Sequence, residues 1–559
     1  MYTSNMRKYL IILGLSLACI CQGWAQSGNN KKQNTDTRLD AQQYLEIMGA
    51  AINTLQRHFV DSIDWAKAMT AGLDAMLATL DPYTEFYTEE DTEDFKTMTT
   101  GEYAGIGAVI QQNGDTVIVS DPQEGRPAQV AGLCAGDAIL KVNGESMLKK
   151  TTQEVSDKLR GDANTDITVE VLRPYETEPR IFSFKRSKIL TDVVPYYGWM
   201  NDSIAYVILN QFTDKAAQDV QTALLNMKDA NDGHSLKGVV LDLRSNPGGL
   251  LEEAVKIVSL FVPKGSTVVS TRAKYAEWES TTRTSTQPLD TVVKIAVLIN
   301  RNSASASEIV SGALQDMDRG VIMGERSYGK GLVQSTGQLP YNTLMKFTSA
   351  KYYTPSGRCV QAIDYTHRNE DGSVGRIPDS LTHVFHTAIG REVRDGGGIK
   401  PDVEKTAEEM SNLEYYIVLE NLSFKYATYF RHVNADNREL TDKDYEDFKK
   451  MVIDSKRDTL VKALNLNLAH DLDSLKAPIL KLLRADIAQR YGFQKAKYKV
   501  NVENDELVRD AVALLADDKR YREILSAPAT LTDEKAKKAG KKKALKAIEK
   551  ELKKSINPL

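Results

Sequence analysis

Three serines that alternate with small residues, Ser303, Ser305 and Ser307, are the first feature of the sequence that could carry chemistry. An apolar stretch, KIAVLIN, precedes them and an apolar-periodic stretch, ASEIVSGALQDM, follows, which predicts a strand, a turn and a helix. The carboxyl edge of a sheet and the free N–H groups of a helix start suit a nucleophile whose reaction develops negative charge. The residues alone leave a structural alternative, in which Ser303 caps the helix and the other two serines face solvent.

A lysine between two glycines, Lys330 in GERSYGKGLVQ, could supply the base. A lysine accepts a proton only when it is neutral, and lowering its pKa from ~10.4 to ~7 by burial costs about 4–5 kcal/mol. A neutral amine could then take the proton of a serine hydroxyl, so that no histidine is needed. Gln334, four residues later, would fall on the same side of a following strand and could orient the amine. The alternative of a phosphate-binding turn lacks the rest of the phosphate-loop pattern.

A glycine pair, Gly248-Gly249, stands in DLRSNPGGLLEEAVKIV, where a buried strand passes directly into a helix. Glycines let the backbone approach a ligand, and N–H groups at a helix start can hold an oxyanion. By itself the pattern is equally a tight strand–helix turn.

The order of predicted elements indicates several domains. Residues 39–80 have the apolar spacing of two amphipathic helices, and residues 105–174 hold short β-branched runs separated by turn residues. Strands then alternate with helices from residue 203 to about 325, which is typical of an α/β core with a parallel sheet. After Val403 the pattern is helical.

The segments SASASEI, GKGLVQ, DLRSNPGG and PAQVAGLCAGDAILKVNG together resemble the carboxy-terminal processing proteases, which are secreted serine–lysine peptidases with a PDZ domain. The resemblance implies an α/β, multidomain chain, with a crotonase/ClpP-like protease core, an inserted β-rich PDZ domain, N-terminal helices and an added C-terminal helical module. The family places its lysine 25 positions after its nucleophile, which selects Ser305 among the three serines.

The resemblance also implies roles for individual residues. Ser305 would be the nucleophile and Lys330 the base, with Gln334 positioning the amine. The oxyanion hole would be formed by the backbone N–H groups of Ala306 and of Gly248 or Gly249, and Asp316 would be an assisting acid. In the PDZ domain, a loop and strand edge would hold the C-terminal tail of a substrate through Gly105, Ile106, Gly107, Ala108 and Val109. No metal and no cofactor is expected.

The predicted domains are a signal peptide (1–25), a linker and helices (26–92), a PDZ domain (93–188), a protease core (189–403, with an insert at 366–397) and a helical extension with a Lys-rich tail (404–559). The insert interrupts a usually short path in the family, and residues 404–500 have no counterpart in the resemblance. Cys134 and Cys359 are the cysteines outside the signal peptide, and a disulfide between them is weakly supported.

Composition and the N-terminus bear on location and partners. With 559 residues, 42% hydrophobic residues and a net charge of −4, the chain has no basic excess to attract nucleic acid. The charged and then apolar start predicts export to the periplasm, or a membrane-attached form if the signal is not cleaved. Expected partners are proteins or peptides with accessible apolar C-termini. The N-terminal helices could form a homodimer or pack within the chain. An adaptor protein, whose identity the sequence does not give, could be a further partner. Two rival functions are a non-catalytic PDZ adaptor and acyl-CoA chemistry on the same scaffold.

Overall fold

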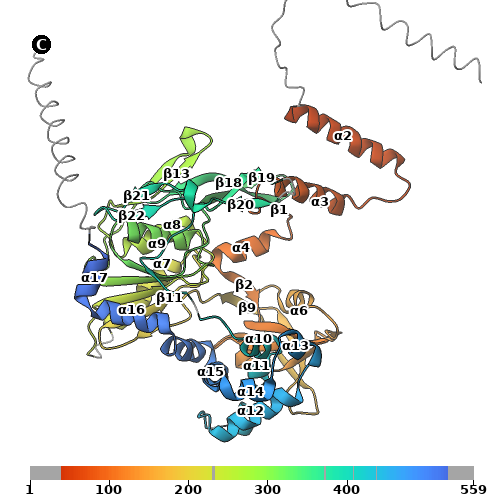
Figure 1. The fold of residues 1–559 in the computed structure, drawn as a ribbon. Helices are drawn as coiled ribbons and strands as arrows, with labels where there is room; N and C mark the ends of the chain where they lie inside the picture. The colour runs from red at the N-terminus through yellow and green to blue at the C-terminus, as the bar shows by residue number, and fades with distance from the viewer. Residues whose placement is uncertain (1–39, 230–232, 370–372, 407, 436, 527–559) are drawn as a thin grey trace, which may run out of the picture. The chain divides into compact units, whose positions relative to one another are not determined.

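The structure is a computed structural model that describes residues 40–229, 233–369, 373–406, 408–435 and 437–526 (Figure 1). The predicted signal peptide and Lys-rich tail lie outside these residues. The chain divides into one unit that ends at Gly72 and another that begins at Leu73. The first unit contains helix α2 (Ala41–His58), which starts with a capping box between Asp40 and Gln43. No residue of α2 is buried. Helix α3 (Trp65–Ala78) follows, so the two predicted N-terminal helices are confirmed.

Six strands form the main sheet of the second unit. Their order is β10 (Tyr197–Trp199), β11 (Ile204–Ile208), β12 (Gly238–Asp242), β15 (Lys294–Ile299), β16 (Val321–Gly324) and β23 (Val403–Glu404). All neighbours from β11 onward are parallel, and β10 is antiparallel to β11. Strand β12 is buried along its whole length, as an apolar strand covered on both faces should be. The predicted α/β core is confirmed.

Side chains that alternate along these strands enter two separate apolar clusters. On one face of the sheet, Val239 and Leu241 pack with helices α7 (Ala216–Asp229), α8 (Leu251–Ser259) and α9 (Ala306–Asp316). On the other face, Val240 packs with α16 (Glu506–Ala516) and α17 (Asp518–Ile524). The predicted boundary after residue 403 therefore does not hold for these last helices, because their apolar side chains complete the core of the sheet.

The predicted β-rich domain forms a second sheet. Its strands are β3 (Ala108–Asn113), β4 (Thr116–Pro122), β5 (Ala138–Val142), β7 (Asp166–Leu172) and β8 (Arg180–Lys185), in that order, with β6 (Glu145–Ser146) beside β5. Helices α5 (Pro127–Ala131) and α6 (Thr152–Leu159) belong to the same domain. Helix α4 (Thr92–Thr100) precedes the domain, and β2 (Glu102–Gly105) pairs with β9 (Ser187–Leu190) where the chain enters and leaves it.

A third sheet lies beside the serine helix. Strand β18 (Leu344–Tyr353) pairs with β1 (Glu85–Tyr87), β17 (Leu332–Gln338) and β13 (Thr267–Ala273), and β13 pairs in turn with β14 (Ser280–Arg283). The predicted insert forms two hairpins, β19 (Ile363–Arg368) with β20 (Val374–Arg376) and β21 (Val384–His386) with β22 (Glu392–Arg394). Through β18, strand β1, which precedes the PDZ domain in the chain, lies in the same sheet as β17, which follows Lys330.

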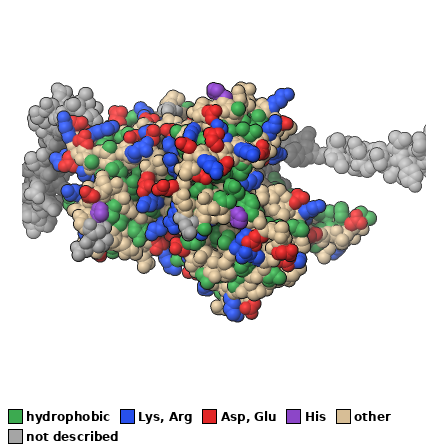
Figure 2. Space-filling view, turned by 90° about the horizontal axis from the view of Figure 1, so that it is seen from below, with side chains coloured by type: hydrophobic (Ala, Val, Ile, Leu, Met, Phe, Trp, Pro, Cys, Tyr) green, Lys and Arg blue, Asp and Glu red, His purple; other side chains and the backbone are tan. Residues whose placement is uncertain are grey.

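The helical extension has an apolar core of its own. It consists of α10 (Asn412–Leu419), α11 (Leu422–Val433), α12 (Asp442–Asp454), α13 (Asp458–Ala463), α14 (Leu468–Ser474) and the first part of α15 (Lys476–Glu503). Within the described ranges, no helix combines the length and apolar character that crossing a bilayer requires. On the face seen in Figure 2, acidic and basic side chains are interspersed, in keeping with the small net charge.

Candidate active site

The three serines of the run differ in what their hydroxyl groups do. Ser303 is buried and donates to the carbonyl of Leu243 at 2.9 Å, and Ser307 is buried and donates to the carbonyl of Asn246 at 2.9 Å. Ser305 is only partly buried, and its hydroxyl donates to no other described residue. The alternative in which Ser303 caps the helix while Ser305 and Ser307 face solvent is therefore wrong for Ser303 and Ser307, which hold neighbouring backbone in place.

Ser305 also has an unusual backbone conformation. Its φ is 55° and its ψ is −112°, a positive φ that non-glycine residues rarely adopt and that costs about 1–3 kcal/mol. The turn between β15 and α9 enforces this conformation, and α9 begins at the next residue. A strained conformation of this kind persists only where surrounding contacts hold it. Here it places the Ser305 side chain at the carboxyl edge of the sheet.

Those contacts come from Glu308, a residue that the sequence reasoning did not select. Its carboxylate is fully buried and accepts from the backbone N–H of Ser305 (2.9 Å), Gly329 (2.8 Å) and Lys330 (2.9 Å). It also accepts from the hydroxyl of Ser327 at 2.5 Å. One side chain therefore fixes the backbone of the serine turn and of the lysine loop to each other. Burial raises the pKa of Glu308, although these four donors act to lower it. The signal in the sequence was the spacing Ser-Ala-Ser-Glu, which is the pattern of a capping box.

Lys330 lies partly buried in the loop before β17. The pKa of its amine is lowered to about 8, first by burial and then by the nearby charge of Lys346, against the opposing effect of Asp81, Glu85 and Glu308. Burial therefore destabilises the ammonium form more than the neighbouring carboxylates stabilise it. No hydrogen bond joins Lys330 Nζ to the Ser305 hydroxyl in the described part of the chain. The lysine side chain lies against the ring of Tyr83, with Nζ 4.1 Å from the ring centroid.

The glycine turn packs directly against the serine. A Cβ on Gly248 would lie 2.8 Å from the Ser305 Cβ and 2.8 Å from the Ala304 carbonyl, and the φ of Gly248 is 106°. The Gly248 N–H donates to the Asn246 side chain at 2.9 Å, so this glycine is not available as an oxyanion donor. The N–H groups of Gly249 and Ala306, by contrast, donate to no described residue. Of the two glycines that the sequence left open, the geometry therefore favours Gly249.

Gln334 lies on β17 in the third sheet. Its amide donates to the Thr348 hydroxyl at 3.4 Å, and no hydrogen bond between it and Lys330 is present in the described ranges. A register shift between Val333 and Gln334 alters the simple alternation on which the prediction relied. The backbone N–H of Thr348 in turn donates to the Thr84 hydroxyl oxygen at 3.3 Å, which keeps Gln334 near the segment that covers Lys330.

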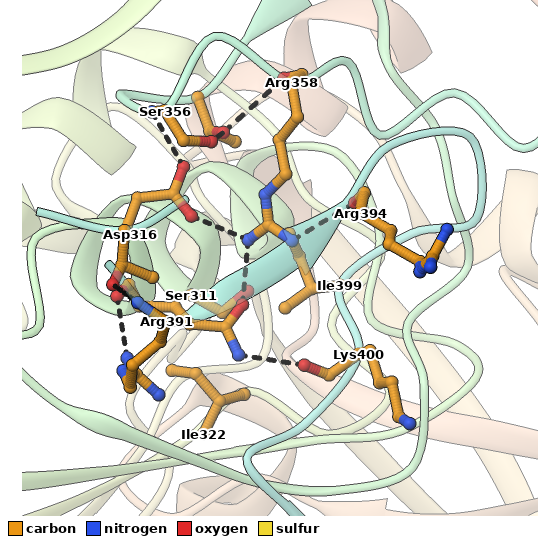
Figure 3. Close-up of polar contacts among 12 residues, drawn as sticks. Ser311, Asp316, Ile322, Ser356, Arg358, Arg391, Arg394, Ile399 and Lys400 are labelled. Atoms are coloured by element: carbon orange, nitrogen blue, oxygen red, sulfur yellow. Dashed lines mark hydrogen bonds and ion pairs between the residues drawn. The ribbon is translucent and has the colours of Figure 1, made fainter. Parts of the chain in front are cut away.

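Asp316 does not lie near the serine. It ends α9, whose 11 residues separate it from Ser305 by about 16 Å along the helix. Its carboxylate forms a buried ion pair with Arg358 at 2.8 Å and accepts from the Ser356 backbone at 3.0 Å (Figure 3). The geometry therefore gives Asp316 a structural role, and its predicted assistance to the reaction has no contact to support it.

The predicted tail-binding segment has the geometry of an open strand edge. Gly105 ends β2 and Ala108 begins β3, with Gly107 at a φ of 69° between them. Within the described part of the domain, β3 pairs with β4 alone, and Val109 on it is 47% exposed. Helix α6 packs against β3. An extended peptide could therefore add to this edge.

The cysteines and the possible metal ligands among the described residues form no second reactive site. Cys134 and Cys359 are both free thiols, so the disulfide considered from the sequence is absent. Burial raises the pKa of both thiols, which makes them less reactive. Across the described residues, no group of His, Cys, Asp and Glu side chains is arranged to hold a metal ion.

Comparison with known proteins agrees with this architecture. Family models match residues 203–367 as peptidase family S41, residues 118–173 as a PDZ domain and residues 453–515 as the C-terminal helical domain of a probable PDZ-protease. The last match corrects the expectation that residues 404–500 have no counterpart in related proteins. Fold and matches together define an S41-type peptidase architecture with a PDZ domain.

Two curated proteins and one solved structure are similar to this chain, and the first of them shows the family. The carboxy-terminal-processing protease of Bartonella bacilliformis is 35% identical over 363 residues, which cover 65% of this chain and 82% of that protein. A probable CtpA-like serine protease of Staphylococcus aureus is 38% identical over 299 residues, which cover 53% of this chain and only 58% of that protein. The solved structure of the photosystem II D1 C-terminal processing protease covers 66% of this chain and 94% of its own, at 25% identity and a TM-score of 0.34. The chain belongs to the carboxy-terminal-processing protease family.

Proposed function

We propose that this chain is an exported serine endopeptidase that cleaves proteins recognised by their C-terminal tails and that uses Ser305 and Lys330 as a catalytic dyad. The observation that carries the proposal is the carboxylate of Glu308, which bonds to the backbone N–H of both residues. Among the described residues around this carboxylate, the Ser305 hydroxyl and the Lys330 amine also donate no hydrogen bond to another residue. Family membership supports the same chemistry.

In the proposed reaction, the neutral amine of Lys330 accepts the Ser305 proton as the serine oxygen attacks the peptide carbonyl. The N–H groups of Ala306 and Gly249 would stabilise the oxyanion, at the start of a helix whose dipole also favours negative charge. The Lys330 ammonium would then protonate the leaving amine. Water would hydrolyse the acyl-enzyme with Lys330 again as base. Gln334 would orient the amine once a substrate has displaced its present contacts.

The PDZ domain would select substrates with accessible apolar C-termini, through strand addition along Gly105–Val109. A turn with Gly107 at a positive φ, followed by a strand edge that is open among the described residues, supports this proposal. The predicted export, the periplasmic location and a homodimer through the N-terminal helices belong to the same proposal. The exposed apolar side chains of α2 are compatible with such a dimer.

The test compares cleavage of an unfolded protein with an apolar C-terminus by the full chain and by single variants. Ser305→Ala and Lys330→Ala should each abolish cleavage, with circular dichroism unchanged. Ser303→Ala is the matched control, because it removes a structural hydroxyl from the same serine run. It should lower stability, but the fraction that stays folded should still cleave. The same substrate with a charged C-terminal extension should be cleaved more slowly. Normal cleavage by Lys330→Ala would refute the dyad, and tail binding without turnover would favour a PDZ adaptor instead.

A further inference from the structure

The ring of Tyr83 covers the amine of Lys330, with Nζ 4.1 Å from the ring centroid. Among the described residues, this ring face is the one directed contact of the amine, because no hydrogen bond or ion pair of Nζ accompanies it. An ammonium over the face of an aromatic ring is attracted by the ring's quadrupole, whereas a neutral amine is not. The contact therefore favours the form of Lys330 that cannot act as a base.

Tyr83 is held in this place by contacts that do not involve Lys330. Its hydroxyl lies 3.4 Å from the Tyr328 hydroxyl and 3.2 Å from the Tyr365 hydroxyl, and its ring meets that of Tyr365 edge to face. The Asp81 carboxylate accepts from the backbone N–H of Tyr83 and Thr84, each at 2.8 Å. The ring position is thus set by the turn between α3 and β1, together with the insert-proximal strand β19.

Several charged groups face Lys330 from the elements packed around it. They are Asp81 and Glu85 from the segment that carries Tyr83, Lys346 from β18 and Glu308 from α9. Their effects on the amine partly oppose one another, and Lys346 is itself paired with Glu85. Tyr83 differs from all of them because it touches the amine and can be altered without changing the charge of the site.

We infer that Tyr83 is a positioning residue that holds Lys330 in its ammonium form on the ring face, and that the segment 81–87 controls the dyad through this contact. The inference rests on the proposed Ser305–Lys330 function. Among the described residues, the lysine amine contacts this ring face and makes no hydrogen bond to the Ser305 hydroxyl. Substrate binding, or a shift of the turn that carries Tyr83, would release the ammonium to lose its proton to water, and the neutral amine would then accept the proton of the Ser305 hydroxyl.

The first test is the pH profile of kcat/KM for Tyr83→Leu and Tyr83→Phe. Leucine keeps an apolar cover but removes the ring face, so the acid limb should move to lower pH by about 0.5–1 unit. At pH 6.5, kcat/KM should then rise about 3–10-fold over the unaltered chain. Phenylalanine keeps the ring face and should leave the limb within about 0.2 unit. A loss of kcat/KM at every pH with an unmoved limb would show a merely structural role and overturn the inference.

The second test needs no peptidase activity. Competitive acetylation with peptide-resolved mass spectrometry measures the pKa of Lys330 directly in full-length Ser305→Ala chains, with and without Tyr83→Leu. The shift should match that of the kinetic limb. Tyr275→Leu is the matched control, because Lys274 Nζ lies 5.6 Å from that ring on a remote hairpin, and it should leave Lys330 unchanged. If the chain with Ser305 intact never cleaves, while the Ser305→Ala chains show the Lys330 shift, the dyad is refuted and the Tyr83 contact stands. A chain that cleaves while Lys330 titrates identically with and without Tyr83→Leu would refute the inference alone.

Discussion

Replacing Glu308 with glutamine should loosen the link between the serine turn and the lysine loop. Each carboxylate oxygen now accepts two donors: Oε1 accepts from Ser327 and Gly329, and Oε2 accepts from Ser305 and Lys330. A glutamine amide can replace only one of these oxygens. The orientation that places its NH₂ beside Ser327 is the better one, because that hydroxyl can turn and accept.

Even in that orientation the Gly329 N–H remains buried without an acceptor, which costs about 1–3 kcal/mol. The other bonds also lose the strength that a charged acceptor provides. We therefore expect Glu308→Gln to lower the free energy of unfolding by about 2–4 kcal/mol. Because the proposed dyad would depend on this carboxylate for its spacing, kcat/KM should fall by at least about tenfold in the fraction that stays folded.

Urea unfolding followed by circular dichroism measures the first effect, and cleavage at low urea measures the second. Glu414→Gln is a matched control, since Glu414 occupies the same capping-box position in α10 and accepts from the Ser411 N–H at 2.9 Å, remote from the serine. That variant should change stability by no more than about 1 kcal/mol and leave kcat/KM unaltered. A Glu308→Gln chain as stable and as active as the Glu414→Gln chain would refute the positioning role of Glu308.

Three further outcomes follow from the same geometry. Since the pKa of Lys330 is lowered to about 8 and its neutral amine is the proposed base, kcat/KM should rise through pH 8 toward a plateau near pH 9–10; a flat profile between pH 6 and 9 would contradict this. Gly248→Ala should abolish cleavage, because its Cβ would meet Ser305 Cβ at 2.8 Å and because alanine is strained at a φ of 106°; an active Gly248→Ala chain would contradict the packing. Asp316→Asn breaks a buried pair with Arg358 and should cost about 3–5 kcal/mol in thermal or urea unfolding, yet leave the acid limb of the pH profile in place, whereas a moved limb would restore the assisting role.

Periodicity and turn residues were sufficient to predict most of the elements. The stretch KIAVLIN, the serine run and the apolar-periodic stretch after it form β15, the turn and α9, because each depends on local apolar spacing. The resemblance to the family selected Ser305 and Lys330, and the structure ties their backbones to one carboxylate. The hydrogen bond of the Gly248 N–H was beyond such reasoning, because it depends on the Asn246 side chain, which folds back in the turn. The buried ion pair of Asp316 with Arg358 was beyond it too, because it joins segments that are distant in the sequence.

By itself the sequence determined the order of strands and helices, the residue types able to react and the resemblance that relates them, since these are properties of neighbouring residues. Tertiary structure alone decided that Glu308 joins the serine turn to the lysine loop, that Tyr83 covers the amine and that α16 completes the core sheet. Each of these contacts joins segments far apart in the chain. Their energies arise from burial and from the loss of water around polar groups, which no local pattern encodes.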